Sequence, residues 1–166
     1  MDGKQKMRMI PIRVLAVCLA AAGLTACAPT APTRQAPQDA AVQCQVPTTG
    51  ETLIGNWLSV ASERGVAGAV RTLYTLNPDG TMVYVQQIKR PNSPSQGLHE
   101  SGCWQRQGAT LVLRTVLSNG SPVNLDDPIY TNHYEVVRAD ASGLRMRDGA
   151  RLIDARRMSP GYRLPF

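Results

Sequence analysis

The sequence predicts an all-β protein, an eight-stranded antiparallel up-and-down barrel that follows a cleaved signal peptide and a flexible linker. Turn signals rich in Asn, Asp, Gly and Pro recur at short intervals after Asn77. The segments between these turns alternate apolar and polar residues with a period of two, which is typical of strands with one buried face. All eight aromatic residues lie between Trp57 and Phe166, so the core-forming part of the chain begins near residue 51.

The expected strands are short and follow one another directly. Tyr74 and Leu76 precede the turn at residues 77–80, and Met82 and Tyr84 follow it with the same alternating spacing. A loose turn or short helix is expected at residues 62–70. Such a meander removes its exposed edges by closing into a barrel. The strands are expected at residues 53–62, 70–76, 81–89, 99–106, 110–117, 129–138, 143–147 and 150–157.

The segment from Met1 to Ala26 has the composition of a secretory signal peptide. Lys4, Lys6, Arg8 and Arg13 make a basic start, and Val14–Leu24 is an uncharged, largely apolar run. A transmembrane helix needs about 20 apolar residues to cross a bilayer, and this run is much shorter. The short run therefore favours a leader that is cut off.

The leader ends in Leu24-Thr25-Ala26-Cys27, which resembles the lipobox of bacterial lipoproteins. The resemblance implies that the Cys27 thiol receives a diacylglyceryl group, that the chain is cut before Cys27, and that the new amino terminus is acylated, for example with palmitate. Two or three acyl chains anchor a protein stably, whereas one anchors it weakly. The alternative is a plain secretory cut. Ala28 follows the cysteine where enterobacteria-like sorting uses Asp for inner-membrane retention, so the expected location is the cell envelope, on the periplasmic face of the outer membrane.

The net charge of +6 comes largely from the leader. Cleavage removes four basic residues and one acidic residue, which leaves 14 basic and 11 acidic residues and a charge of +3. These basic residues form no stripe and no nucleic-acid-binding motif, so nucleic acid is not an expected partner. Residues 28–41 contain three prolines and no large apolar residue, which is typical of an extended tether. The expected domains are a signal peptide (1–26), a lipidated cysteine with its linker (27–50) and a barrel (51–166).

The four cysteines reduce to one pair. Cys18 leaves with the leader and Cys27 carries lipid, so Cys44 and Cys103 remain in an oxidising compartment. We expect a Cys44–Cys103 disulfide that closes a long loop, and two free thiols are the alternative. A metal site or a catalytic thiol at these cysteines has few candidate partners, since His99 is the only histidine near either of them in the sequence.

Several short motifs resemble those of lipocalins and their calycin relatives. Gly55-Asn56-Trp57 resembles the Gly-x-Trp that opens the lipocalin barrel, and Asn77-Pro78-Asp79-Gly80-Thr81 resembles a hairpin of small bacterial lipocalin-like domains. Gly102-Cys103-Trp104, followed by Gly108 and Leu111-Val112-Leu113, resembles the middle of those domains. The motif residues of the barrel are Gly55, Trp57, Gly80 and Trp104.

The resemblance also carries expectations for single residues. In lipocalins an arginine of a late strand packs across the first tryptophan, and Arg156 or Arg157 is expected to take this place. The domain is shorter than a typical lipocalin, and no C-terminal helix is recognisable in the sequence. The side chains expected to line the lumen are Tyr74, Tyr84, Leu111, Leu113, Tyr134 and Met146.

No motif for catalysis, phosphate binding or metal binding is found, so we expect neither an enzyme, nor a metal, nor any cofactor besides the lipid on Cys27. Asp126-Asp127 is expected in a solvated turn, and His99 and His133 as ordinary surface or half-buried histidines. The predicted function is a membrane-anchored binding module for a small apolar or amphipathic ligand or an envelope partner protein. The alternatives are a periplasmic protease inhibitor that uses residues 43–49, and a structural or stress-response envelope lipoprotein.

Replacing Cys27 tests the lipid anchor. Cys27→Ser removes the thiol that the lipobox resemblance assigns to lipid, so the variant is expected to lose all lipid labelling and to release the domain in soluble form. Metabolic labelling with a radioactive fatty acid measures this loss. Continued incorporation of lipid into the variant would show that the lipobox interpretation is wrong.

Overall fold

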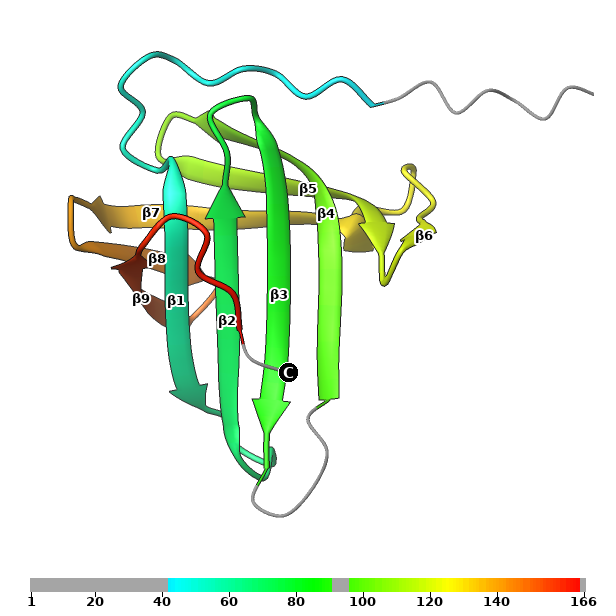
Figure 1. Cartoon of the computed structure of the whole chain (residues 1–166), viewed down its shortest axis with the longest axis vertical. Coiled ribbons are helices and arrows are strands. Elements are labelled where there is room, and N and C mark those ends of the chain that lie inside the picture. The colour runs from blue at the N-terminus through cyan, green and yellow to red at the C-terminus, as the bar shows by residue number, and fades with distance from the viewer. Residues whose placement is uncertain (1–41, 91–95, 165–166) are drawn as a thin grey trace, which may run out of the picture. The chain divides into compact units, whose positions relative to one another are not determined.

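Eight antiparallel strands close into a barrel in the computed structural model, which describes residues 42–90 and 96–164 (Figure 1). Neighbouring strands pair in the order β4-β3-β2-β1-β9-β8-β7-β5, and β4 pairs with β5 to close the ring. A very short strand, β6 (Ser121–Pro122), pairs with β5 outside this ring, and a short 3-10 helix, η1 (Pro128–Tyr130), leads into β7. The strands of the ring are β1 (Gly55–Ser62), β2 (Ala69–Leu76), β3 (Thr81–Lys89), β4 (Gln96–Gln107), β5 (Thr110–Ser118), β7 (Thr131–Ala139), β8 (Gly143–Asp148) and β9 (Arg151–Met158).

The eight-stranded antiparallel barrel predicted from the sequence is confirmed, with small shifts at strand ends. β1 begins at Gly55 rather than at residue 53, because Leu53 and Ile54 belong to a turn in which the Ile54 amide donates to the Glu51 carbonyl. β7 begins at Thr131, since Asp127 caps η1 and residues 128–130 form that helix instead of extended chain. Residues 63–68 form turns and bends, as expected.

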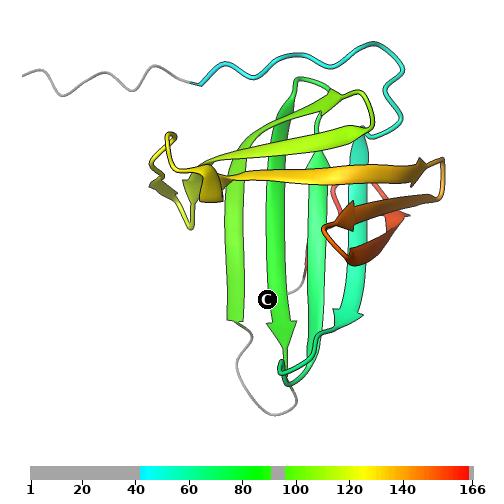
Figure 2. The same cartoon turned by 180° about the vertical axis from the view of Figure 1, so that it is seen from behind.

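The strands run in two directions. β1 to β4 stand side by side, and β5, β7, β8 and β9 run across them, which is seen most clearly from behind in Figure 2. β4 belongs to both sets because it pairs with β3 through Gln96–Cys103 and with β5 through Glu100–Gln107. A register shift between Ser101 and Gly102 bends it, as β-bulges do. Gly102 is required there, because a Cβ would collide with the Arg114 carbonyl oxygen.

One end of the barrel, here named the closed end, is filled by side chains. The two indoles lie there with their polar atoms satisfied, since Trp57 Nε1 donates to the Leu53 carbonyl at 2.8 Å and Trp104 Nε1 to the Asn77 carbonyl at 2.9 Å. These side chains pack against one another in a single buried cluster at the closed end. The fully buried apolar side chains are Leu53, Trp57, Leu76, Met82, Trp104, Leu111, Leu113, Leu144 and Met146.

The N-terminal segment, residues 42–54, lies over the closed end. A disulfide between Cys44 and Cys103 ties it to β4, with 5.2 Å between the two Cα atoms, and this confirms the predicted pairing. Glu51 adds an ion pair with Arg106 at 3.0 Å. Gly80 lets the segment approach closely, because a Cβ at this position would collide with the Gln45 carbonyl oxygen.

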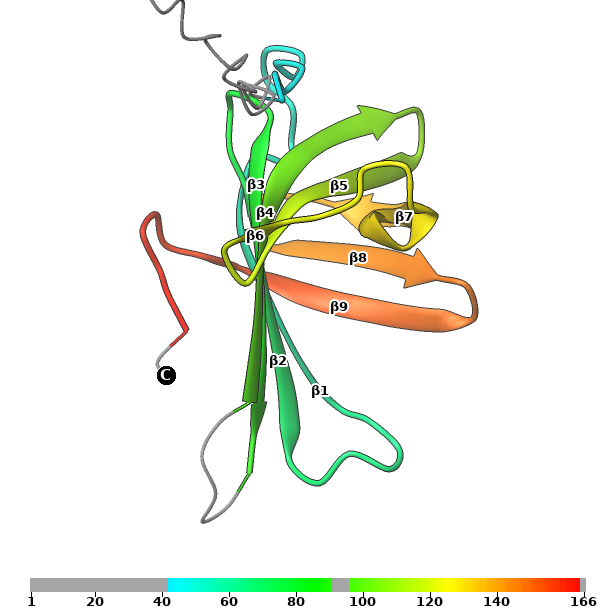
Figure 3. The same cartoon turned by 90° about the vertical axis from the view of Figure 1, so that its right-hand side faces the viewer.

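The C-terminal strap, which we define as residues Ser159–Leu164, leaves β9 and lies on the outer face of the barrel. Its last described residue, Leu164, is buried against Leu58, Leu73 and Val85, which point outward from β1, β2 and β3. Figure 3 shows the strap on the outer side of the β1–β4 wall, away from β7, β8 and β9. In this strap the described chain turns at Pro160 and Gly161 and then continues to Leu164 without regular secondary structure.

The leader, Cys27 and the tether at 28–41 lie outside the described residues, so the predictions made for them stay predictions. In the described part of the chain there is no helix with the length and hydrophobicity needed to cross a membrane.

Loss of the disulfide is expected to destabilise the barrel. A Cys44→Ser/Cys103→Ser double variant loses a cross-link between positions far apart in the sequence, and its free energy of unfolding should fall by about 2–4 kcal/mol because the unfolded chain gains freedom. Urea unfolding followed by tryptophan fluorescence measures this difference. Unvaried protein in reducing agent is the matched control and should lose the same amount, whereas unfolding curves that are identical with and without reductant would contradict the bond.

Candidate functional site

The barrel wall is incomplete between β1 and β9. β1 pairs with β2 along its whole length, but with β9 only through Asn56–Ser59 and Ala155–Met158. Beyond Ser59 the two strands separate, as Figure 3 shows. The gap leads into the barrel through a cavity of about 230 Å³. We name this gap and its cavity the lateral opening.

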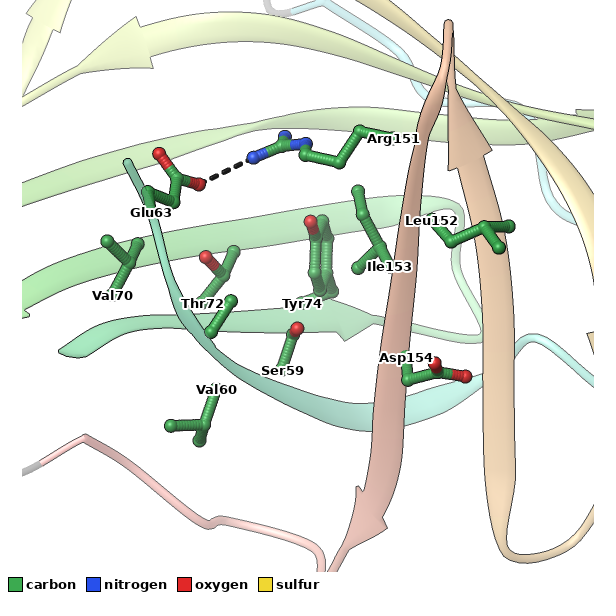
Figure 4. Close-up of a pocket in the computed structure, with 11 residues that line it drawn as sticks. Ser59, Val60, Glu63, Val70, Thr72, Tyr74, Arg151, Leu152, Ile153 and Asp154 are labelled. Carbon is green, nitrogen blue, oxygen red and sulfur yellow. Dashed lines mark hydrogen bonds and ion pairs between the residues drawn. The ribbon is translucent and has the colours of Figure 1, made fainter. Parts of the chain in front are cut away.

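The lateral opening combines polar and aliphatic side chains. Ser59, Thr72 and Tyr74 point into it from β1 and β2 and bring three hydroxyl groups, as seen in Figure 4. Glu63, from the turn after β1, faces Arg151, from the start of β9, across the gap. The aliphatic residues around it are Val60, Ala61, Val70, Leu152 and Ile153, and Asp154 is also at the edge.

An ion pair spans the lateral opening. Arg151 lies 2.6 Å from a Glu63 carboxylate oxygen and 3.2 Å from Asp148, and its side chain is 50% exposed. Partial burial would lower the pKa of Arg151, but the two carboxylates together raise it, so the guanidinium stays charged. Because exposed ion pairs contribute only about 0–1 kcal/mol, separating Glu63 from Arg151 costs little.

Three tyrosines continue the polar half of the lumen beyond the cavity. The Tyr74 ring meets Tyr84 and Tyr134 edge to face, with ring centroids 5.3 Å and 6.0 Å apart. Gln86 Nε2 donates to the Tyr84 hydroxyl at 3.0 Å and to Thr72 Oγ1 at 3.3 Å. Burial raises the pKa of all three tyrosines, that of Tyr74 most clearly, so their hydroxyl groups are neutral at physiological pH.

The structure places the six side chains that were expected to line the lumen in two groups. Tyr74, Tyr84 and Tyr134 lie in the polar half, and Tyr74 borders the cavity itself. The other three are buried in the apolar half at 0–2% exposure and are not among the residues that border the lateral opening. These three are Leu111, Leu113 and Met146.

The motif residues Gly55, Trp57, Gly80 and Trp104 lie at the closed end, and none of them lines the lateral opening. Of the two candidate arginines it is Arg157 that packs across the first tryptophan, with its guanidinium carbon 4.1 Å from the Trp57 ring centroid. Arg157 also donates to the carbonyls of Ile54 and Thr52 at 2.9 and 3.0 Å. Gly55 is required beside it, because a Cβ there would meet the guanidinium. These residues pack at the closed end of the barrel, and none of them borders the lateral opening.

Sequence reasoning missed four residues of the lateral opening: Ser59, Glu63, Thr72 and Arg151. Ser59 and Thr72 could have been found, since each lies two positions along its strand from an aromatic side chain, Trp57 or Tyr74, that faces inward. Glu63 and Arg151 meet only because β1 and β9 separate, and no local pattern encodes that separation.

The other residues considered from the sequence lie apart from this site. His99 and His133 are exposed on β4 and β7, and Asp127 accepts a hydrogen bond from the Ile129 amide as the cap of η1. Across residues 42–90 and 96–164, no group of three His, Cys, Asp or Glu side chains is arranged to hold a metal ion. Residues 43–49, the expected inhibitory segment, are largely irregular chain, and Val46 within them is 68% exposed.

Comparison with known proteins finds no matching family model, no matching curated protein and no matching solved structure.

The buried tyrosines predict how stability depends on pH. A pKa that is raised above the unfolded value of 10.0 gives a contribution that is fully present below pH 10 and is lost as the pH rises through the folded pKa. Urea unfolding at pH 8, 9, 10 and 11 should show constant stability up to about pH 10 and a decline above it. Tyr74→Phe should reduce the decline, and an equally steep decline in that variant would show that Tyr74 does not contribute.

Proposed function

We propose that this chain is a lipid-anchored cell-envelope protein whose lipocalin-like barrel binds a small amphipathic carboxylate at the lateral opening. The observation that carries this proposal is the exchangeable ion pair, Arg151 with Glu63, placed across the entrance to a partly polar cavity. A ligand carboxylate can take the place of Glu63 on the guanidinium, and water then solvates the displaced Glu63 carboxylate, whose side chain is 36% exposed. Arginine binds carboxylates in a bidentate manner, which adds geometric specificity.

The size of the cavity limits the ligand. A volume of about 230 Å³ lies below the roughly 300–1,000 Å³ of sites that take drug-sized ligands. The apolar half of the lumen is filled by Trp57, Trp104 and their neighbours, so a long chain has no space inside the barrel. We therefore propose a ligand with one charged group and a compact apolar body, such as a single ring or a short branched chain.

The walls of the cavity suit this ligand. Val70 and Ile153 offer apolar contact, and the neutral hydroxyl groups of Tyr74 and Thr72 offer hydrogen bonds deeper inside. Hydroxyl groups both donate and accept, so they accommodate a second polar group on the ligand. This set of side chains favours reversible binding.

Two observations support the lipocalin-like and envelope parts of the proposal. Arg157 on the Trp57 ring reproduces the packing that the lipocalin resemblance implies. The Cys44–Cys103 disulfide is the kind of bond that persists in an oxidising compartment such as the periplasm. Together with the lipobox at Cys27, they favour a barrel held at the envelope by a tether.

A protease inhibitor is the second candidate function. The segment at residues 43–49 supports it, because the disulfide holds one end of the segment and the Val46 side chain is exposed. A protease cleft can bind an exposed apolar side chain on an irregular segment that a disulfide fixes to the barrel. Failure to slow a panel of secreted metalloproteases and serine proteases would remove this candidate.

Variants of the cavity test the binding proposal. The full chain carrying Cys27→Ser is titrated with benzoate, 4-hydroxybenzoate, 3-methylbutanoate and their neutral amides, and binding is followed by ligand-observed NMR. The carboxylates are expected to bind and the amides to bind more weakly. Arg151→Met should weaken carboxylate binding about 10- to 100-fold, since a charge-assisted hydrogen bond contributes about 1.5–3 kcal/mol. Ser59→Leu should abolish it by filling the cavity.

Arg147→Met is the matched control for this experiment. Arg147 is exposed on β8 and pairs with Glu135 at 3.1 Å, so its loss removes one arginine outside the lateral opening. Affinity equal to that of the unvaried chain is expected. Carboxylates that bind equally well to Arg151→Met, or no binding by any member of the panel, would contradict the proposal.

A further inference from the structure

A second and larger cavity lies outside the barrel. It has a volume of about 720 Å³ and runs between the C-terminal strap and the outer faces of β1, β2 and β3. We name it the strap groove. Side chains alternate across the wall, so Leu73 points into the strap groove while its neighbours Thr72 and Tyr74 point into the lateral opening. The two cavities are therefore separated by the sheet.

The strap groove is apolar and has the size of a ligand site. Its volume falls within the roughly 300–1,000 Å³ typical of small-molecule sites. The strap that forms one wall is held in place, because Asn56 Nδ2 donates to the Ser159 carbonyl at 2.9 Å and Leu164 is buried against the sheet. The apolar side chains that line the groove include Leu73, Val83, Val85, Met158, Tyr162 and Leu164.

The backbone and the two asparagine side chains on the sheet side of the strap groove are already hydrogen-bonded. β2 pairs along its whole length with β1 and with β3, so the backbone beneath the groove is occupied. Asn56 is bonded to the strap, and Asn77 Nδ2 donates to Thr81 Oγ1 at 2.9 Å. An extended peptide would bury amide groups here without partners, at about 1–3 kcal/mol for each. An acyl chain carries no such groups.

Arg163 places a positive charge at the edge of the strap groove. Arg163, on the strap, and His99, on β4, line the groove with exposed side chains, and none of the described residues that line it carries a carboxylate. Arg163 forms no ion pair with any carboxylate in the described part of the chain. Arg157 also borders the groove but is engaged with two carbonyls and with Trp57. Arg163 is thus the guanidinium that remains for an anionic group.

We propose that the strap groove is a second binding site, which takes a long-chain fatty acid with its acyl chain along β1–β3 and its carboxylate at Arg163. The apolar trough, the engaged amide groups and the unpaired guanidinium fit this ligand better than a peptide. The site is independent of the lateral opening, so either proposal can fail while the other stands.

A fluorescent fatty acid tests this site. The full chain carrying Cys27→Ser is titrated with 11-(dansylamino)undecanoate, and palmitate below its aggregation concentration is then used as competitor. Saturable binding of one molecule per chain and displacement by palmitate are expected. Arg163→Gln should weaken binding about tenfold, and dodecanol, which lacks the charge, should compete poorly. Val83→Glu places a carboxylate in the trough and should weaken binding further.

Matched controls lie outside the groove. Arg156→Gln changes an exposed arginine of β9, and Val137→Glu changes a valine of β7 that is 46% exposed, and both should bind the fatty acid as the unvaried chain does. Arg163 is exposed, so its variant keeps the test valid even if Val83→Glu fails to fold. Binding that is insensitive to Arg163→Gln would overturn the proposal. Loss of fatty-acid binding in Ser59→Leu but not in Val83→Glu would place the fatty acid inside the barrel and overturn the proposal. An acidic, apolar peptide that binds more tightly than the fatty acid would instead assign the groove to a protein partner.

Discussion

The pairing of β4 with both β3 and β5 is the constraint on which the rest of the structure depends. Without that double pairing the eight strands would form an open sheet with two free edges. The bulge at Gly102 makes the double pairing sterically possible, because it bends the strand where a side chain would collide with β5. Once the ring is closed, every strand position faces either the interior or the outside, and each apolar side chain must find its partner on one of those two sides.

Successive side chains of a strand alternate between the inside and the outside of the barrel, so a strand with two apolar faces also places apolar side chains on the outer surface. Leu58, Leu73 and Val85 cannot enter the lumen, since their neighbours in the chain already do. The strap covers part of this outer surface and leaves a hollow beside it. The inner side divides in a similar way into an apolar half filled by two indoles and a polar half with hydroxyl groups and one ion pair. The lateral opening lies where the pairing of β1 with β9 stops. The strap groove lies beside the strap, on the outer face of β1, β2 and β3.

How much of this could be read from the sequence depends on the range of the interaction. The strands were predictable because period-two alternation and turns such as Asn77–Gly80 are local signals. The disulfide followed from counting cysteines. The choice between Arg156 and Arg157 was not predictable, since a shift by a single position in the β1–β9 register exchanges the inward and outward faces. The lateral opening depends on where that same pairing stops, and the strap groove depends on a C-terminal segment with no periodic pattern. Both are long-range features that local patterns do not encode.

The disulfide has a mechanical consequence. Cys44 is the point at which the chain upstream of the barrel becomes covalently joined to Cys103 in β4. Tension applied through the preceding chain is therefore transmitted to a strand that is hydrogen-bonded on both sides, and it bypasses β1, whose contact with β9 is short. A barrel held in this way can be pulled at its N-terminal end without the seam between β1 and β9 being peeled apart.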